Sequence, residues 1–184
     1  ARFRHVIGEI AMLLTYEVAK DIPVEEFVVQ TPLQETTGYR IKGSVNIIPI
    51  LRAGLGFLDG VIKVLPEANV GHIGMARNEE TLEPIEYYCK LPKDKEAFTI
   101  VVDPMLATGL SMEVAYKALL SHGTPKNVHV ACLFGTPQAI NYLSESMPED
   151  TTLWCAVIDP VLNEKKYIVP GLGDAGDLCF GEKL

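Results

Sequence analysis

The sequence predicts an α/β fold in which helices flank a central, mostly parallel sheet. Short apolar runs alternate with segments of helical periodicity, as in chains built from successive strand-helix-strand units. Hydrophobic residues make up 48% of the chain and charged residues 22%, so the chain can bury a core. Its 184 residues suit a single domain, and we expect residues 1–184 to form one.

Charge and cysteine content narrow the class of protein. The net charge of -8 argues against a nonspecific nucleic-acid binder, which needs a basic surface. The four cysteines lie far apart without a CxxC pair, so they indicate neither a zinc site nor a disulfide framework. No long apolar run or signal-peptide pattern occurs. We therefore expect a cytoplasmic protein with no membrane or nucleic-acid partner. The chain starts without Met, and we expect a native N-terminal piece to precede it.

In the first half of the chain, helical spacing of apolar residues predicts a helix from Phe3 to Ala19. The run Val45–Ile50 predicts a buried strand, followed by a turn at 51–54 and a helix that ends near Leu65. Val70–Met75 predicts another short strand. This order is that of one strand-helix-strand unit.

In the second half, the segment 77–92 is charged at its start and aromatic at its end, and we expect a hairpin that stands off the sheet. A helix is predicted over Met112–Ser121, with Gly123 as its stop signal. The segment 167–181 is rich in glycine and lacks periodicity, so we expect a loop. The remaining strands are predicted at Ala97–Val102, Val128–Leu133 and Thr152–Ile158.

The stretch VVDPMLATGLS at 101–111 combines a strand end, a turn and a helix start. Ligands of open α/β sheets collect beyond such strand ends, and free N–H groups at a helix start suit a phosphate. Thr108 and Ser111 add hydroxyl donors, while the carboxylate of Asp103 suits ribose hydroxyls. A ribose 5-phosphate site is one interpretation. The other is that Asp103 only ends a strand and Ser111 only caps a helix.

An acid after an apolar strand, followed by Thr-Gly-x-Ser at a helix start, resembles the phosphoribosyl-diphosphate signature of type I phosphoribosyltransferases. The segment DPMLATG, with Pro104 after the acid, resembles the corresponding segment of the uracil phosphoribosyltransferase branch. PILRAGLG (49–56), RNEETLEP (77–84) and YIVPGLGDAGD (167–177) are similar to that family's segments in the same order. The resemblance implies the type I fold, with a stand-off hairpin and a C-terminal hood loop that binds the base.

The resemblance implies transfer of a phosphoribosyl group from 5-phosphoribosyl 1-diphosphate to uracil. It makes Asp103, Arg52 and Asp174 the catalytic residues. The implied contacts to the sugar diphosphate are Arg52, Arg77, Asp103, Pro104, Met105, Leu106, Ala107, Thr108, Gly109, Leu110, Ser111 and Asp174. The implied contacts to uracil are Ile168, Gly173, Asp174 and Ala175. Mg2+ would arrive with the sugar diphosphate, without an assigned protein ligand. Relatives associate into dimers or tetramers, and some are activated by GTP.

These roles agree with the chemistry of the residues. Arg52 lies in a glycine-containing turn after a strand, where a forked guanidinium and backbone amides can hold a diphosphate together. Its alternative is a solvated surface charge. Uracil is small and neutral, so main-chain groups of PGLGDAGD can bind its edge.

Two rival functions stay open at this stage. A regulator of pyrimidine genes with the same fold would bind nucleotides and RNA, but the acidic balance disfavours RNA. A transferase for a purine base would typically use an aromatic side chain, which PGLGDAGD lacks.

Overall fold

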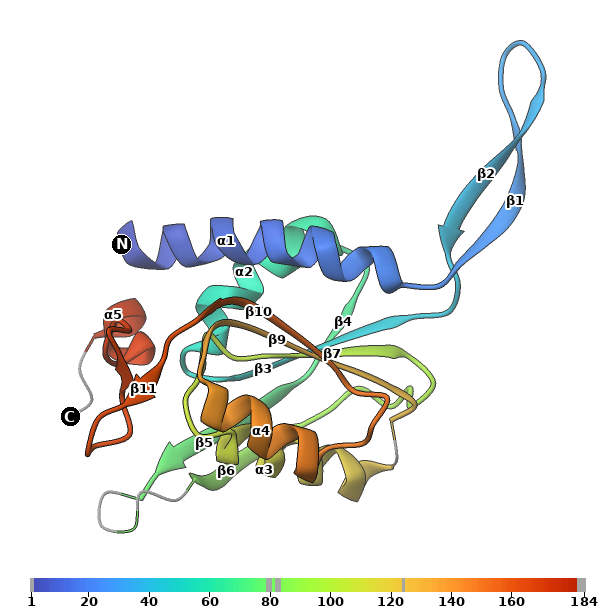
Figure 1. Ribbon diagram of the computed structural model, residues 1–184. Coiled ribbons are helices and arrows are strands. Elements are labelled where there is room, and N and C mark those ends of the chain that lie inside the picture. Colours follow the sequence, from blue (N-terminus) through green and yellow to red (C-terminus); the bar gives the residue numbers. More distant parts are fainter. Residues whose placement is uncertain (1, 79–80, 82–83, 124, 182–184) are drawn as a thin grey trace.

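The computed structural model describes residues 2–78, 81, 84–123 and 125–181. Its centre is an eight-stranded sheet whose main path runs β10-β9-β7-β3-β5-β6 (Figure 1). Neighbours along this path are parallel except for β5 and β6. The strands are β3 (Val45–Leu51), β4 (Asn69–Val70), β5 (His72–Arg77), β6 (Pro84–Lys90), β7 (Phe98–Val102), β8 (Met105–Leu106), β9 (Asn127–Gly135) and β10 (Thr152–Ile158).

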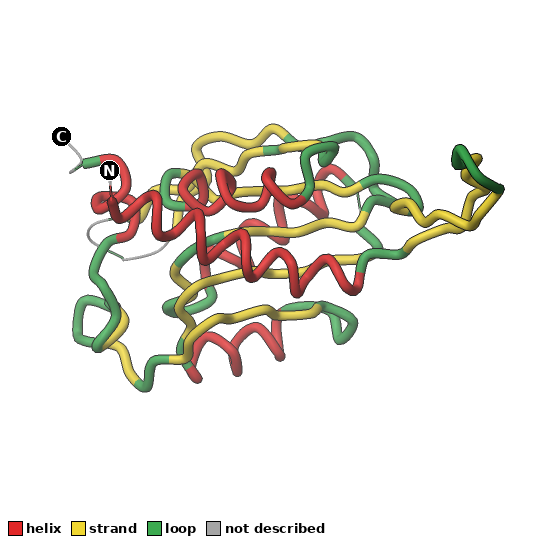
Figure 2. The backbone as a smooth tube through the Cα atoms, turned by 90° about the horizontal axis from the view of Figure 1, so that it is seen from above, coloured by secondary structure: helices red, strands yellow, loops and turns green. Residues whose placement is uncertain are grey.

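Helices cover both faces of this sheet (Figures 1 and 2). The helices α1 (Arg2–Val18) and α2 (Gly54–Val64) pack on one face, and α3 (Leu110–His122) and α4 (Pro137–Ser146) on the other. Successive residues of one strand face opposite layers, so Ile47 packs with the first pair and Ile48 with the second. Burial on both faces explains why the strands are continuous apolar runs. The predicted fold class is confirmed.

The predicted elements match with local differences. Thr152–Ile158 is confirmed residue for residue. The predicted strand at Val70–Met75 is two strands, because Gly71 interrupts it and donates its N–H to the carbonyl of Ile47 at 2.9 Å. The first helix ends in a 3-10 turn, η1 (Ala19–Asp21). The helix α4 was not predicted. No described helix is long and apolar enough to cross a membrane.

The hairpin predicted at 77–92 proves to be continuous with the sheet edge. β5 pairs antiparallel with β6 along its length, and it also pairs with β3 through Ile73 and Gly74. The predicted hairpin is therefore present, and its base forms one side of the sheet, with β6 as the edge strand. The tip at 79–80 and 82–83 lies outside the described residues.

A second hairpin, which was not predicted, projects from the body of the molecule. Its strands β1 (Val24–Gln30) and β2 (Glu35–Ile41) pair with each other, and Figure 2 shows them extending away from the layers. Large apolar side chains along this arm are exposed, among them Val28, Leu33 and Tyr39.

The tail is not the loop expected for 167–181. It contains the strand β12 (Ile168–Val169), which pairs with β11 (Val161–Leu162) just before it, and a six-residue helix, α5 (Ala175–Phe180). Asp174 caps this helix, because its carboxylate accepts the N–H of Asp177 at 2.9 Å. A helix this short shows no periodicity, which is why the pattern indicated a loop.

Candidate active site

Three segments meet at the edge of the sheet where β3 and β7 end. These are the turn at Arg52, the loop that starts at Asp103, and the tail around Asp174. Asp174 lies near enough to Asp103 for its charge to raise the pKa of that carboxyl group. On the other side, a Cβ placed on Gly176 would lie 3.7 Å from Nη2 of Arg52. The tail thus bridges the two loops that were predicted to bind one ligand.

Asp103 follows β7 directly and lies in a crowded environment. Its backbone N–H donates to the carbonyl of Ala131 at 3.2 Å, and its Oδ1 accepts the N–H of Met105 at 3.3 Å. Burial raises the pKa of Asp103 to about 7, the N–H of Met105 lowers it, and the charge of Asp174 raises it further. Near neutral pH the carboxyl group is therefore partly protonated, and a ligand that donates hydrogen bonds to it would favour its charged form and offset its desolvation.

The loop after Asp103 is held against β9. Pro104 accepts the N–H groups of Leu133 and Phe134 at 3.1 and 3.0 Å, and the two residues of β8 then pair with Phe134 and Gly135. Thr136 fixes the next part of the loop. Its hydroxyl donates to the carbonyl of Ala107 at 2.7 Å and accepts the N–H of Ala139, the capping bond of α4. These contacts therefore hold the loop in place before any ligand binds.

The helix α3 begins earlier than expected, at Leu110. Its N-cap is Gly109, which has φ +86° and supplies no side chain. A Cβ at Gly109 would also lie 2.9 Å from the ring of Tyr142. Ser111 is thus the second residue of the helix, so the interpretation of Ser111 as the cap was wrong. Thr108 accepts the N–H of Leu110 at 3.4 Å. The first turn of α3 offers N–H groups beside two hydroxyls, which suits a phosphate.

Arg52 lies between the end of β3 and the start of α2. Its Nη2 donates to Oδ1 of Asp177 at 2.5 Å and to the carbonyl of Gly181 at 3.3 Å, and its side chain is half-buried. The peptide bond Leu51–Arg52 is cis. A Cβ at Gly54 would lie 2.9 Å from the carbonyl of Val102, so only glycine lets α2 start this close to β7. The interpretation of Arg52 as a solvated surface charge was wrong.

The residues predicted to bind the base all lie in the tail. Ile168 and Ala175 are buried, whereas Gly173 is exposed with φ +84° and open space around its Cβ position. Asp159, which follows β10, is only 8% exposed and accepts the N–H of Gly171 at 3.0 Å. This bond ties the glycine-rich loop to the sheet.

The prediction for Arg77 lies partly outside the described part of the structure. Its backbone ends β5 opposite Pro84. The position of its side chain is not described.

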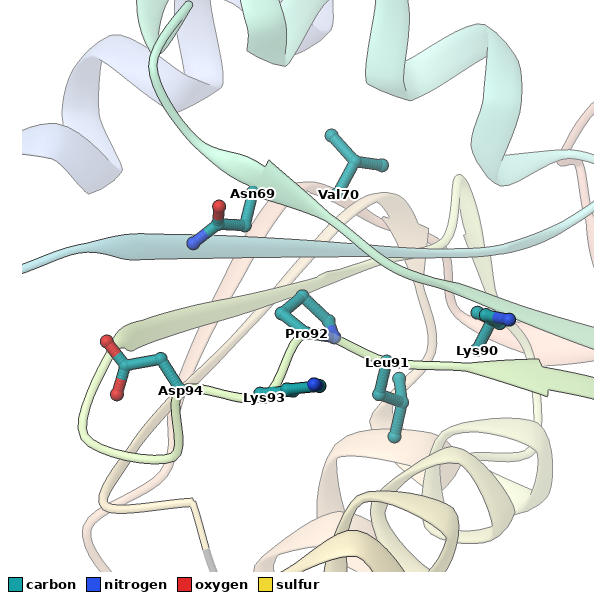
Figure 3. A pocket seen from close by; sticks show the side chains of 7 residues that line it. All are labelled: Asn69, Val70, Lys90, Leu91, Pro92, Lys93 and Asp94. Carbon is teal, nitrogen blue, oxygen red and sulfur yellow. The ribbon is translucent and has the colours of Figure 1, made fainter.

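A separate hollow of about 450 Å³ lies near the start of β3, at the opposite end of the strands from Asp103 (Figure 3). Its lining includes Asn69 and Val70, which pair with Asn46 and Ile47 at the start of β3. None of the predicted site residues lines it. Strand direction and side-chain chemistry favour the edge with Asp103 as the functional site.

Three residues of this region were not predicted from the sequence as part of the site. Thr136 is followed by Pro137, a pair typical of a helix start that could have revealed both α4 and the capping hydroxyl. Asp177 lies three residues after Asp174, the spacing of a capping motif. Asp159 follows a strand directly, like Asp103, and position alone could have marked it.

Solved structures of phosphoribosyltransferases share the fold of this chain. A hypoxanthine-guanine phosphoribosyltransferase from Bacillus anthracis matches with a TM-score of 0.57 at 15% identity, covering 87% of this chain and 80% of that one. A purine phosphoribosyltransferase from Pyrococcus horikoshii matches with a TM-score of 0.54 at 18% identity, covering 85% and 89%. At these identities the likeness shows the fold alone.

Sequence comparison identifies the family. The model of the uracil phosphoribosyltransferase family matches residues 1–182, so the chain belongs to this family. A uracil phosphoribosyltransferase from Finegoldia magna is 50% identical over 184 residues, covering 99% of this chain and 87% of the relative. One from Enterococcus faecalis is 49% identical over 183 residues, covering 98% and 87%. The AQ2163 protein from Aquifex aeolicus matches in structure with a TM-score of 0.90 at 38% identity, covering 97% and 85%. These matches favour an enzyme over the regulator.

Proposed function

We propose that this chain transfers the 5-phosphoribosyl group of 5-phospho-α-D-ribose 1-diphosphate to N1 of uracil, giving UMP and diphosphate. The observation that carries the proposal is the meeting of Asp103, Arg52 and Asp174 at one edge of the sheet, in a chain of the uracil phosphoribosyltransferase family. The named relatives at about half identity support uracil as the base.

Each segment has a distinct role in binding the sugar diphosphate. Asp103 accepts hydrogen bonds from the ribose hydroxyls, and the first turn of α3 binds the 5-phosphate with Thr108 and Ser111. Arg52 binds the diphosphate, and Arg77 contributes from the β5–β6 hairpin. The loop 104–111 supports these contacts because Thr136 and β9 hold it in place.

Uracil binds in the tail, where Ile168, Gly173, Asp174 and Ala175 surround it. Backbone groups of the loop can match its carbonyl acceptors and ring N–H. Cytosine presents an amino donor where uracil presents an acceptor, so a backbone N–H aimed at that position rejects it.

The reaction is a displacement at C1 of the ribose. The bond from C1 to the diphosphate oxygen breaks, a bond from C1 to N1 of uracil forms, and the diphosphate leaves with the electron pair. N1 loses its proton, and we propose the carboxylate of Asp174 as its acceptor. The chain contributes by aligning the two substrates and by stabilising the charge on the departing diphosphate.

Mg2+ is the cofactor that we propose for this step. Asp103 and Asp174 offer oxygen donors of the kind Mg2+ prefers, near enough for their charges to interact. Within the described ranges, no group of three or more His, Cys, Asp or Glu is placed to hold a metal. We therefore propose that the ion is carried by the substrate phosphates. Bound there, it would neutralise part of the charge on the leaving group.

We also propose that the chain acts as a homo-oligomer, a dimer or a tetramer. The exposed apolar side chains of the β1–β2 arm, such as Val28 and Leu33, and of α1, such as Leu13 and Tyr16, offer surface that a second copy can bury. Activation by GTP stays a prediction. A cytoplasmic location is supported by the four cysteines, none of which forms a disulfide.

A direct assay tests the proposed reaction. The purified chain is mixed with 5-phosphoribosyl 1-diphosphate, Mg2+ and one base at a time, and the nucleotide product is measured. We expect UMP from uracil and no product from cytosine, hypoxanthine or orotate. Turnover with hypoxanthine or orotate instead of uracil would contradict the base assignment. Specific RNA binding without turnover would support the regulator.

Asp159 should matter for uracil rather than for the sugar diphosphate. Asp159→Ala removes the acceptor of the Gly171 N–H, so the loop loses a bond that orders the base site. We expect the KM for uracil to rise about 10-fold, the equivalent of one buried hydrogen bond. Asp159→Asn keeps a carbonyl oxygen at the same place and should stay near the wild type. Equal KM values for the wild type and the Ala variant would rule this role out.

A further inference from the structure

The first turn of α5 rests directly on the turn that holds Arg52. A Cβ at Gly176 would lie 3.7 Å from Nη2 of Arg52 and 3.9 Å from the backbone nitrogen of Ala53. Further along α5, Cys179 is buried, and its sulfur would lie 3.1 Å from a Cβ at Gly56 in α2. The tail helix and the start of α2 are therefore packed together along two successive turns.

An ion pair joins the two elements at this contact. Nη2 of Arg52 lies 2.5 Å from Oδ1 of Asp177, and each side chain is 32% exposed. The same nitrogen also donates to the carbonyl of Gly181 at the end of α5. Both ends of this short helix thus fix one nitrogen of the guanidinium. Nε of Arg52 is buried and has no hydrogen-bond partner among the described residues.

We propose that Asp177 is a positioning residue that orients Arg52 for the diphosphate. This inference rests on the proposed function, in which Arg52 binds that group. A free arginine loses about 2 kcal/mol of rotamer entropy when a ligand fixes it. Asp177 fixes the side chain before the ligand arrives and engages one nitrogen, leaving other N–H groups of the fork for phosphate oxygens.

The position of Asp177 also links the two halves of the site. Asp174 and Asp177 lie in the same helical turn, and the carboxylate of Asp174 accepts the N–H of Asp177. Asp174 is proposed to contact uracil and the sugar diphosphate. The helix that presents the base contact is thus the one that orients the diphosphate contact.

Four variants test the proposal by titration calorimetry of 5-phosphoribosyl 1-diphosphate with Mg2+, without any base: two of Asp177, Arg52→Ala, and the double variant. Asp177→Asn removes the charge, and we expect about 10-fold weaker binding, as for loss of one charge-assisted contact. Asp177→Glu keeps the charge and should bind more tightly than the Asn variant. In an Arg52→Ala background, Asp177→Asn should have no further effect, because Asp177 acts through Arg52.

The control is Glu25→Gln, which breaks an exposed 2.7 Å ion pair with Arg40 on the β1–β2 arm and should leave binding unchanged. Unchanged or tighter binding by Asp177→Asn would overturn the proposal, as would an equal loss in both backgrounds. Steady-state assays should show a higher KM for the sugar diphosphate and a kcat within about twofold of the wild type. Because the calorimetry contains no base, a failed uracil assay with normal binding would count against the proposed function and not against this role.

Discussion

Replacing Asp103 by asparagine should reduce kcat/KM for the sugar diphosphate by about 100-fold or more while leaving the fold intact. A carboxylate that accepts two ribose hydroxyls makes two charge-assisted hydrogen bonds worth about 1.5–3 kcal/mol each. Asparagine keeps an oxygen for the N–H of Met105 but loses the charge. Steady-state kinetics with uracil and 5-phosphoribosyl 1-diphosphate measure the loss. Near-normal rates would mean that the ribose binds elsewhere.

The same substitution should raise stability above neutral pH. The pKa of Asp103 is raised to about 7 in the folded chain and is about 3.9 in an unfolded one. The folded state therefore binds more protons between these values, and the wild type loses stability as the pH rises from about 4 to 7. Asparagine does not titrate. We expect it to be more stable than the wild type by about 1–3 kcal/mol at pH 8, and the difference to vanish near pH 4.

Asp94→Asn is the control, for which we expect the opposite change in stability. The hydroxyl of Ser44 donates to Asp94 and lowers the pKa of this carboxyl group. Its stabilising effect is present above the unfolded pKa and is lost as the pH falls through the folded one. Asp94→Asn should therefore be less stable than the wild type at pH 8. Thermal unfolding of the three proteins from pH 4 to 8 makes the comparison, and parallel curves for Asp103→Asn and the wild type would contradict the burial of Asp103.

Local patterns predicted the sheet well because its strands are buried on both faces. The predicted strand Ala97–Val102 matches β7 (Phe98–Val102), whose five residues are all buried. The prediction of a loop for the tail was wrong for a physical reason. The helix α5 is stabilised by the cap at Asp174 and by packing on α2, and neither contribution appears as periodicity in the sequence. The β1–β2 arm has strand-forming residues, yet nothing local indicates that it leaves the body.

The candidate site likewise contains residues that local patterns predicted and one residue that they did not. Asp103, Arg52 and the tail could be found because each lies next to a strand end or in a glycine-rich turn. The pairing of Arg52 with Asp177 could not, because the two residues are 125 positions apart and meet only when α5 docks on α2. The residues proposed to bind a ligand thus had local signals, whereas Asp177, which we propose orients Arg52, could be found only from the packing of α5 on α2.

Two glycines at the crossing of α1 and α2 should respond in opposite ways to alanine. A Cβ on Gly60 would lie 2.1 Å from the carbonyl oxygen of Gly8 and 2.8 Å from Cβ of Ala11, so the helices must move apart. Overpacking of this kind costs about 1–3 kcal/mol, and backbone contacts yield less than side chains do. Gly60→Ala should therefore lower Tm by about 2–12 °C, at about 2–4 °C per kcal/mol for a chain of this size.

Gly8→Ala is the matched control on the facing helix. The nearest atom to its Cβ would be the carbonyl oxygen of Gly56 at 3.7 Å, an ordinary contact. Alanine favours a helix interior by about 1 kcal/mol over glycine, so this variant should melt slightly higher than the wild type. Because α2 starts two residues after Arg52, Gly60→Ala should also weaken binding of the sugar diphosphate, while Gly8→Ala should not. Equal melting temperatures for the two variants would contradict the close approach of α1 and α2, and with it the rigid support of Arg52.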